Sequence, residues 1–502
     1  MGNKSGVLLA ILGVCFVAAQ SQTNRPDSET RTEVGQIRDQ LAATQNQLDD
    51  AKAQIQELRS ELQQMKKQLG LSTEPPKPAE QSDAYPTLQD ALKESKPEGA
   101  AAANDQILAA QVEEQAQTKV ESASKYKVRL SGLILMNTYS NVGGVDVSDL
   151  PNLAISRSTP ATGGEFGATL RQTQLGIEVI GPHLAGATSG GDLQTDFFGG
   201  FPDVNYGVTS GLFRLRTARG YLNWGHTRLV AGQDEPFFSP LSPTSYATLA
   251  EPAFAWAGNL WVWTPQIRIE HDWDLSDTSK IGMQFGILDA LTEAEPSNQF
   301  KRTPTPGEAS RMPAFAWHGS WSSQIFGHDA TIGLGSYYSR QSFTFRRHVD
   351  GWGVMADYNL PLSSKLIWSG EVFRGRALGG LGGGIWNSVV YSGTPSLATS
   401  QVIGLNDIGG WTQLKLIPVS KLEFNLAAGA DNPFASDIEF FPNPTGTYFS
   451  PLARNQSIFA NSIFRPRSDL LVAFEYRHLR TYSTNGSKKS ADHLNLALGV
   501  SF

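Results

Sequence analysis

Four arginines in the middle of the chain alternate with apolar residues, as side chains on the two faces of a β-strand do. The pattern reads Phe-Arg-Leu-Arg at 213–216, Arg-Leu-Val-Ala at 228–231 and Ile-Arg-Ile at 267–269. If the apolar residues face lipid or a partner, the arginines face the opposite side of the sheet. Guanidinium groups on one wall bind carboxylates and favour anions in a pore. The members of this arginine wall are Arg214, Arg216, Arg228 and Arg268.

The segment 233–263, between two of these strands, combines acids with an aromatic and apolar composition. It has three acids and no base, together with seven aromatic residues and four prolines. Because so apolar a segment is unfavourable in water, we expect it to fold inward and narrow a channel. Packing against a neighbouring subunit is the alternative. The acids could also neutralise the arginine wall, which would then only brace the segment. Anion selectivity and bracing of the segment are therefore both retained as roles of the wall. These acids are Asp234, Glu235 and Glu251.

Nothing in the sequence predicts catalysis. The eight histidines show no H-x-x-H or H-E-x-x-H spacing, which leaves a metal site without support. The single cysteine, Cys15, precedes residue 20 and excludes a disulfide framework or a thiolate zinc site. His478 and His493 lie near the C-terminus, but the alternation puts His478 on the outward face. We expect no enzymatic activity, no cofactor and no metal ion.

The elements that must position these residues are strands, because apolar residues recur with a period of two from residue 126 to 502. The last segment is the clearest: Leu494, Leu496, Leu498, Val500 and Phe502 alternate with polar or small residues. We count about sixteen such segments. Their connections alternate in length. Short ones fall near 181–184, 224–226, 275–278, 360–364, 418–421 and 465–468, and long ones near 141–166, 199–212, 233–263, 289–310, 377–407 and 431–453.

This asymmetry, the even strand count and the aromatic C-terminal residue predict an all-β transmembrane antiparallel barrel with short turns in the periplasm and long loops outside. Only a closed barrel satisfies every backbone polar group of a sheet in lipid. Composition agrees. The chain has 502 residues, 49 glycines, 18% charged residues and a net charge of −7, so no globally basic surface predicts nucleic-acid binding. After residue 20, no apolar run approaches the length of a spanning helix.

The first quarter of the chain has a different organisation. Residues 1–20 predict a signal peptide, because an apolar run follows Lys4 and ends in small residues. Residues 30–70 predict an α-helical coiled coil in the periplasm, because apolar residues repeat every seven positions from Val34 to Leu69. The coiled coil implies a parallel homo-oligomer, and its pattern does not distinguish a dimer from a trimer. A long helix packed on its own barrel is the alternative. Residues 71–125 form a Pro/Ala-rich linker, and 126–502 form the barrel.

Four stretches resemble the DcaP-like outer-membrane porins, as does the plan of signal, coiled coil, linker and barrel. The first reads Gly-Asp-Leu-Gln-Thr-Asp-Phe-Phe-Gly at 191–199, and the others are 213–216, 229–233 and 264–268. The resemblance implies a homotrimeric porin with an N-terminal coiled coil and a preference for small anions, including dicarboxylates. It also implies that Arg214, Arg216 and Arg268 line the pore.

We therefore predict a porin of the bacterial outer membrane that gives passive diffusion of small hydrophilic solutes, steered by the arginine wall and sieved by 233–263. Its partners would be further copies of the chain, outer-membrane lipid and the solutes. One alternative is a structural tether, in which a plugged barrel anchors the coiled coil. The other is a sugar-specific porin, in which the aromatic residues of 233–263 form a stacking path.

Overall fold

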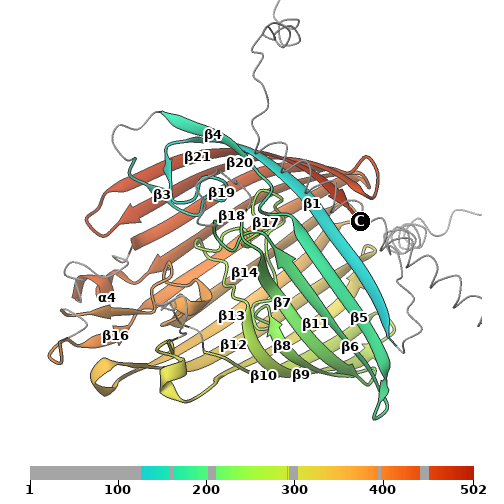
Figure 1. Cartoon of the computed structure of the whole chain (residues 1–502), viewed down its shortest axis with the longest axis horizontal. Helices are drawn as coiled ribbons and strands as arrows, with labels where there is room; N and C mark the ends of the chain where they lie inside the picture. Colours follow the sequence, from blue (N-terminus) through green and yellow to red (C-terminus); the bar gives the residue numbers. More distant parts are fainter. Residues whose placement is uncertain are drawn as a thin grey trace, which may run out of the picture. The chain divides into compact units, whose positions relative to one another are not determined.

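The computed structural model describes residues 126–157, 163–201, 211–290, 292, 303–393, 397–440 and 452–502. These residues form a barrel of antiparallel strands (Figure 1). The predicted signal peptide 1–20, coiled coil 30–70 and linker 71–125 lie outside them. Among the described residues, no helix is long and apolar enough to cross a membrane.

The barrel closes because its first strand pairs with both its last strand and its second. β1 (Lys127–Val142) pairs with β21 (Lys488–Ser501) and with β4 (Gly164–Thr169) and β5 (Gln174–Leu184). β4 and β5 pair with successive halves of β1, so they are halves of one interrupted strand. The seventeen segments of the sheet thus make sixteen barrel strands, and the predicted fold and strand count are confirmed.

The other strands follow in chain order, each paired with the next. They are β6 (Ala187–Asp196), β7 (Arg214–Asn223), β8 (Thr227–Asp234), β9 (Thr264–Ser276), β10 (Ser279–Leu288), β11 (Ala314–Ile325), β12 (His328–Phe343) and β13 (Arg347–Ser363). They continue with β14 (Leu366–Arg376), β17 (Asn406–Val419), β18 (Leu422–Pro433), β19 (Leu452–Phe464) and β20 (Leu470–Ser483). Short elements decorate the loops: β2 (Gly144–Val145), β3 (Ala154–Ile155), β15 (Val389–Tyr391), β16 (Val402–Gly404), α4 (Ala435–Phe440) and the 3-10 turns Glu308–Ser310, Thr344–Arg346 and Gly379–Leu381.

Connections at one end of the barrel are short, and six at the other end are long, as predicted. The hairpin between β5 and β6 turns at Ala185 and Gly186, which both have positive φ, as a tight two-residue hairpin requires. The prediction of a turn at 181–184 is wrong: a register shift between Ile180 and His183 lets Pro182 stay within β5. Two long-end connections, 344–346 and 484–487, are short hairpins that the sequence analysis did not identify.

The alternation along each strand separates an apolar exterior from a polar interior. On β21, Leu494, Leu496 and Leu498 are exposed, whereas His493 and Asn495 are buried in the barrel. The same pattern holds on β20, where Phe474 is exposed and Glu475 is buried. Exposed leucine, isoleucine and phenylalanine side chains therefore form an outward band, as strands in contact with lipid require.

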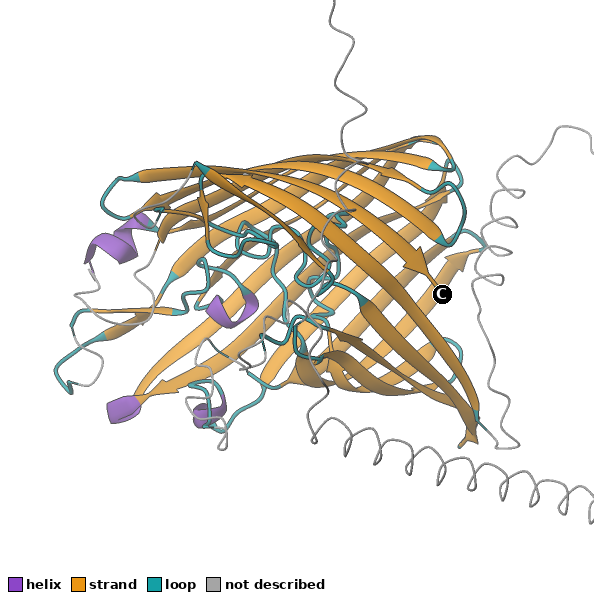
Figure 2. Ribbon diagram, turned by 45° about the horizontal axis from the view of Figure 1, so that its top comes forward, coloured by secondary structure: helices purple, strands orange, loops and turns teal. Residues whose placement is uncertain are grey.

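Two long loops fill part of the interior. The connection between β8 and β9, residues 235–263, is named L3, and the connection between β14 and β17, residues 377–405, is named L6. Loop segments are visible within the ring of strands (Figure 2). Phe237 and Phe238 of L3 and Leu378 and Leu381 of L6 share one buried apolar cluster with side chains of β10 to β14. The apolar composition of L3 is thus accounted for by burial inside the barrel.

Candidate functional site

The first leg of L3, residues 235–250, follows the inner wall of the barrel. Residues along the leg contact seven strands in their order around the barrel, from β9 to β7. The polar contacts are Gln266 Nε2 to Glu235 O (2.8 Å), Ser239 Oγ to Glu371 (2.7 Å), Thr244 N to Gln413 Oε1 (2.7 Å), Asn461 Nδ2 to Thr244 O (2.8 Å), Ser245 Oγ to Glu475 (2.6 Å), Asn137 Nδ2 to Tyr246 O (2.8 Å) and Arg216 to Leu249 O (2.7 Å). L3 therefore forms an inner ring, as the prediction of an inward fold requires.

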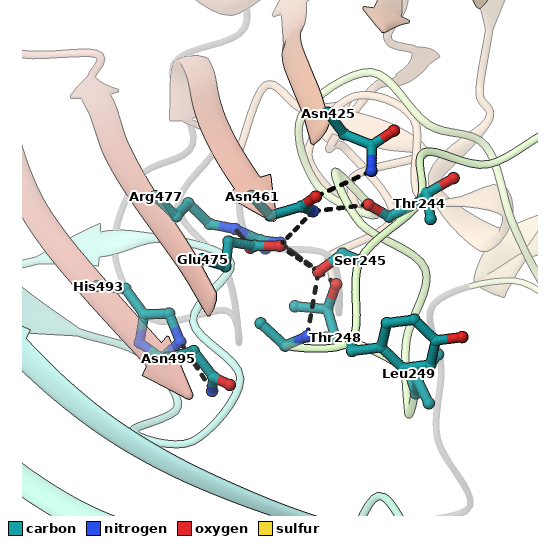
Figure 3. A network of polar contacts seen from close by, with 12 residues as sticks. Thr244, Ser245, Thr248, Leu249, Asn425, Asn461, Glu475, Arg477, His493 and Asn495 are labelled. Carbon is teal, nitrogen blue, oxygen red and sulfur yellow. Dashed lines mark hydrogen bonds and ion pairs between the residues drawn. The ribbon is translucent and has the colours of Figure 1, made fainter. Parts of the chain in front are cut away.

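A buried ion pair on β20 holds the ring on one side. Arg477 and Glu475 alternate with outward side chains, and their guanidinium and carboxylate groups approach within 2.7 Å. Figure 3 shows both facing Ser245 and Thr248 of L3. Asn461 of β19 also donates to Glu475 (3.1 Å). This pair was not predicted from the sequence. The alternation of side chains along β20 places both residues inside the barrel, by the same rule that places the arginine wall there.

Gln172, in the interruption between β4 and β5, holds the ring on the other side. Its side chain is fully buried. Its Nε2 donates to Ala247 O (2.9 Å), and its Oε1 accepts from the backbone N–H groups of Leu249 (2.6 Å) and Ala250 (3.1 Å). One side chain thus satisfies three backbone groups of L3. No sequence pattern pointed to it, because it lies in a break between strands.

The return leg of L3, residues 251–263, packs against β17, β18 and β19. Phe254 stacks on Phe459 of β19 with ring centroids 5.1 Å apart. Gly258 has φ +99°, and a Cβ there would overlap the carbonyl oxygens of Gly410 and Ala430. Trp261 N donates to Leu381 O of L6 (3.0 Å). The two loops therefore pack together inside the barrel.

Arg214 and Arg216 on β7 face the interior and share one acid. Both are ion-paired with Asp196 of β6, at 2.6 Å and 3.1 Å. Both also hold L3, because Arg214 donates to Ala250 O (2.7 Å) and Arg216 to Leu249 O (2.7 Å). Bracing of the loop, which the sequence analysis left open beside selectivity, is present in these contacts.

Arg268 on β9 lies between two acids. Its guanidinium is 2.7 Å from Asp234 and 2.7 Å from Glu270. Asp234 also contacts Arg219 of β7 at 2.7 Å. Arg219 reaches the interior because the pairing of β6 with β7 shifts register between Gln194 and Thr195, so a bulge reverses the parity that the sequence suggested.

The remaining predicted site residues have different surroundings. Arg228 shares a strand face with the buried Val230, and its guanidinium lies over the Tyr221 ring at 4.2 Å. Glu235 is exposed at the start of L3. Glu251, at the turn between the two legs, accepts a hydrogen bond from Asn152 Nδ2 (2.8 Å). Burial raises the pKa of Glu251 to about 7, although Arg214 opposes the shift.

Arginines and aromatic rings alternate in a stack between L3 and the connection 197–213. Arg171 lies between Phe198 (4.0 Å) and Phe201 (4.4 Å). Arg214 follows, 5.4 Å from Phe198 and 4.9 Å from Trp263. Cation–π contacts of this kind stabilise each guanidinium by about 0.5–2 kcal/mol. The stack keeps the planes of the arginines fixed beside L3.

Four of the seven aromatic residues of L3 do not contribute to an accessible stacking path. Phe237, Phe238, Phe254 and Trp261 are buried, so their faces contact protein, whereas Tyr246, Trp256 and Trp263 are half-buried. Among the described residues, no group of three or more histidine, cysteine, aspartate or glutamate side chains is arranged to hold a metal ion. His478 lies on the outward face, as its parity predicts, and contacts Asp492 (2.7 Å).

No protein-family model and no curated protein matches the sequence. Solved structures do match in fold. The outer membrane channel DcaP of Acinetobacter baumannii superposes with a TM-score of 0.57 at 16% identity, over 77% of this chain and 100% of that chain. An anion-selective porin from Comamonas acidovorans gives 0.47 at 11% identity, over 75% and 100% of the two chains. OmpF of Salmonella typhi, in complex with daunomycin, gives 0.43 at 11% identity, over 75% and 98%.

The match to DcaP shows that the chain has the fold of an outer-membrane channel. The predicted resemblance to DcaP-like porins is therefore confirmed at the level of fold.

Proposed function

We propose that the protein is a passive diffusion channel of the bacterial outer membrane for small hydrophilic solutes, with small anions such as dicarboxylates as the preferred class. The observation that carries the proposal is the path of L3. A barrel of about sixteen strands encloses an aqueous lumen, and the first leg of L3 is bonded to strands all around that lumen. A loop attached in this way narrows a channel along its wall. Solutes would move down their own gradients, with no cofactor or energy source.

The anion preference rests on which partner of each ion pair reaches solvent. The Arg214 side chain is 23% exposed, whereas its partner Asp196 is 0% exposed. Arg219 is 28% exposed, against 5% for Asp234. In these two pairs the accessible member is the guanidinium, which attracts carboxylates and offers planar bidentate geometry. In the Arg268–Glu270 pair the carboxylate is the more exposed member, at 19% against 7%. The buried acids hold the arginines in place and reduce their field without removing it.

We test this by measuring the reversal potential of the refolded protein in a planar bilayer across a KCl gradient. The wild type should prefer chloride. Arg214→Ala should reduce the permeability ratio of chloride to potassium by about threefold, which corresponds to about 0.7 kcal/mol of lost Coulomb attraction. The matched control is Arg340→Ala, because Arg340 lies on the outward side of β12 and contacts Asp350 there. A cation preference in the wild type would refute the anion proposal.

A structural tether with a plugged barrel is the second candidate. It is favoured by the packing of L6 on L3 inside the barrel, through Trp261 and Leu381. It predicts no conductance in the same bilayer. The predicted periplasmic coiled coil, which either candidate could use to join copies of the chain, stays a prediction. The sugar-specific alternative keeps three half-buried rings for a stacking path, those of Tyr246, Trp256 and Trp263.

A further inference from the structure

A groove on the outward face of the barrel plays no part in the proposed channel. It lies across β14, β17, β18, β19 and β20, which are neighbours in the sheet (Figure 1). Its volume is about 640 Å³. The floor consists of small outward residues, and larger apolar side chains stand at its sides. The floor residues are Gly410, Ala428 and Ala430, and the sides include Val372, Ile408 and Ile458.

The strand register places a basic residue, Arg480, at one end of this groove. Gly410 pairs with Ala430, Ala430 with Gln456, and Gln456 with Arg480. In antiparallel strands, paired residues share a face. The row therefore runs along the outward surface from the apolar floor to the guanidinium of Arg480.

One hydrogen-bond donor of Arg480 is unsatisfied. Its Nε is buried and has no hydrogen-bond partner among the residues that the structure describes. The acid nearest in register, Asp492, already accepts from Tyr476 (2.7 Å) and contacts His478 (2.7 Å). A buried cationic donor left without an acceptor destabilises the folded state, so an anion at this point would stabilise the fold.

The position of Arg480 along the strand matches a lipid headgroup. It lies close to Ser483, where β20 ends on the long-loop side. Towards the other end of β20, the outward residues are Tyr476, Phe474 and Val472, which are exposed and apolar or aromatic. Tyr482, beyond Arg480, also faces outward by parity. Tyrosines flanking a basic side chain are typical of a membrane–water interface.

We propose that this groove binds one phosphorylated lipid of the outer leaflet. Arg480 donates to a phosphate oxygen, and one acyl chain lies over Gly410, Ala428 and Ala430. Charge complementarity and the apolar floor beside the charge favour this occupant over a second copy of the chain. The proposal rests on the membrane placement given under the proposed function, but not on conduction.

Native mass spectrometry of the detergent-solubilised, folded protein tests the proposal. The probe is bisphosphorylated lipid A, compared with its dephosphorylated form and with inorganic phosphate. Two variants address the two halves of the site: Arg480→Gln removes the charge, and Ala430→Leu fills the floor. Arg340→Ala is the matched charge control. Ala168→Leu is the matched volume control, because Ala168 is exposed on β4, away from the groove.

We expect the wild type and both controls to bind the bisphosphorylated lipid equally. Arg480→Gln and Ala430→Leu should each weaken binding by about tenfold, as expected for loss of one charge-assisted hydrogen bond or one packed chain. Unchanged binding in both variants overturns the proposal, as does equal binding of the dephosphorylated lipid. Inorganic phosphate binding as tightly as the lipid would also overturn it. A change in subunit number in the variants, without a change in lipid binding, would identify the face as a contact between copies.

Discussion

At the scale of single residues, the interior arginines are held by acids, and Asp196 and Asp234 are each more buried than an arginine they hold, Arg214 and Arg219 respectively. Period-two alternation predicted the inward direction of Arg214, Arg216 and Arg268. It could not predict Asp196 as the partner of Arg214 and Arg216, because that contact depends on the register between β6 and β7. Nor could it predict Arg219, because a single bulge reverses which residues face inward. Side-chain direction was thus readable from the sequence, and pairing was not.

Glu251 should make the selectivity of the channel depend on pH. Its pKa is raised to about 7 by burial, so it is neutral below this pH and anionic above it. Because it lies near Arg214, its neutral form leaves more of the arginine charge uncompensated. We therefore expect the chloride preference to rise as the pH falls from about 8 to about 6. Reversal potentials at both pH values measure this.

Two glutamine variants separate this effect from other titrations. Glu251→Gln should show the low-pH selectivity at both pH values. Glu235→Gln serves as the control, because Glu235 is exposed on the same loop, and it should retain the pH dependence. Persistence of the full pH dependence in Glu251→Gln would assign it to another group, such as Asp146, whose pKa burial also raises.

Gln172 should be the most sensitive single anchor of L3. Gln172→Ala leaves the N–H groups of Leu249 and Ala250 without their acceptor, a loss of about 1–3 kcal/mol. We expect single-channel currents that are larger and noisier than those of the wild type, and a lower urea midpoint of unfolding. Gln194→Ala is the control, because Gln194 is exposed on β6. A quiet current of wild-type size in Gln172→Ala would show that this anchor does not limit L3.

At the scale of elements, the composition of L3 predicted its burial but not its path. Aromatic residues, prolines and the absence of bases indicate a loop that avoids water. The path depends on polar residues of seven separate strands, which only closure of the barrel brings together. The inward packing of L6 was not predicted, because its glycine-rich sequence reads as an exposed external loop.

Gly258 should be required for seating the return leg of L3. Its positive φ alone costs about 1–2 kcal/mol for any other residue, and a Cβ would also overlap the backbone of β17 and β18. Gly225 provides a matched control, because it has φ +90° in a short turn with nothing near its Cβ position. Gly258→Ala should therefore lower the unfolding midpoint more than Gly225→Ala does. Equal losses would mean that the return leg can move away from the wall.

At the scale of the whole molecule, the barrel class and strand count followed from periodicity and from the alternation of loop lengths. These signals are repeated about sixteen times along the chain, so errors at single turns, such as 181–184, do not change the outcome. We expect the oligomeric state to depend on the predicted coiled coil, residues 30–70, which lies outside the described structure. We predict a trimer whose subunits separate more readily when 30–70 is deleted. Light scattering of both forms during dilution measures this, and equal dissociation would contradict it.

The central claim is that L3 narrows an open channel. Its most direct test is the single-channel conductance of the wild type beside a variant in which residues 239–261 are replaced by a short Gly-Ser linker. We expect stepwise conductance in the wild type and a conductance at least about twofold larger in the variant, because a wider lumen carries more ions. A closed wild type with a conducting variant would identify L3 as a plug and favour the tether. Equal conductance in both would show that L3 does not set the width of the channel.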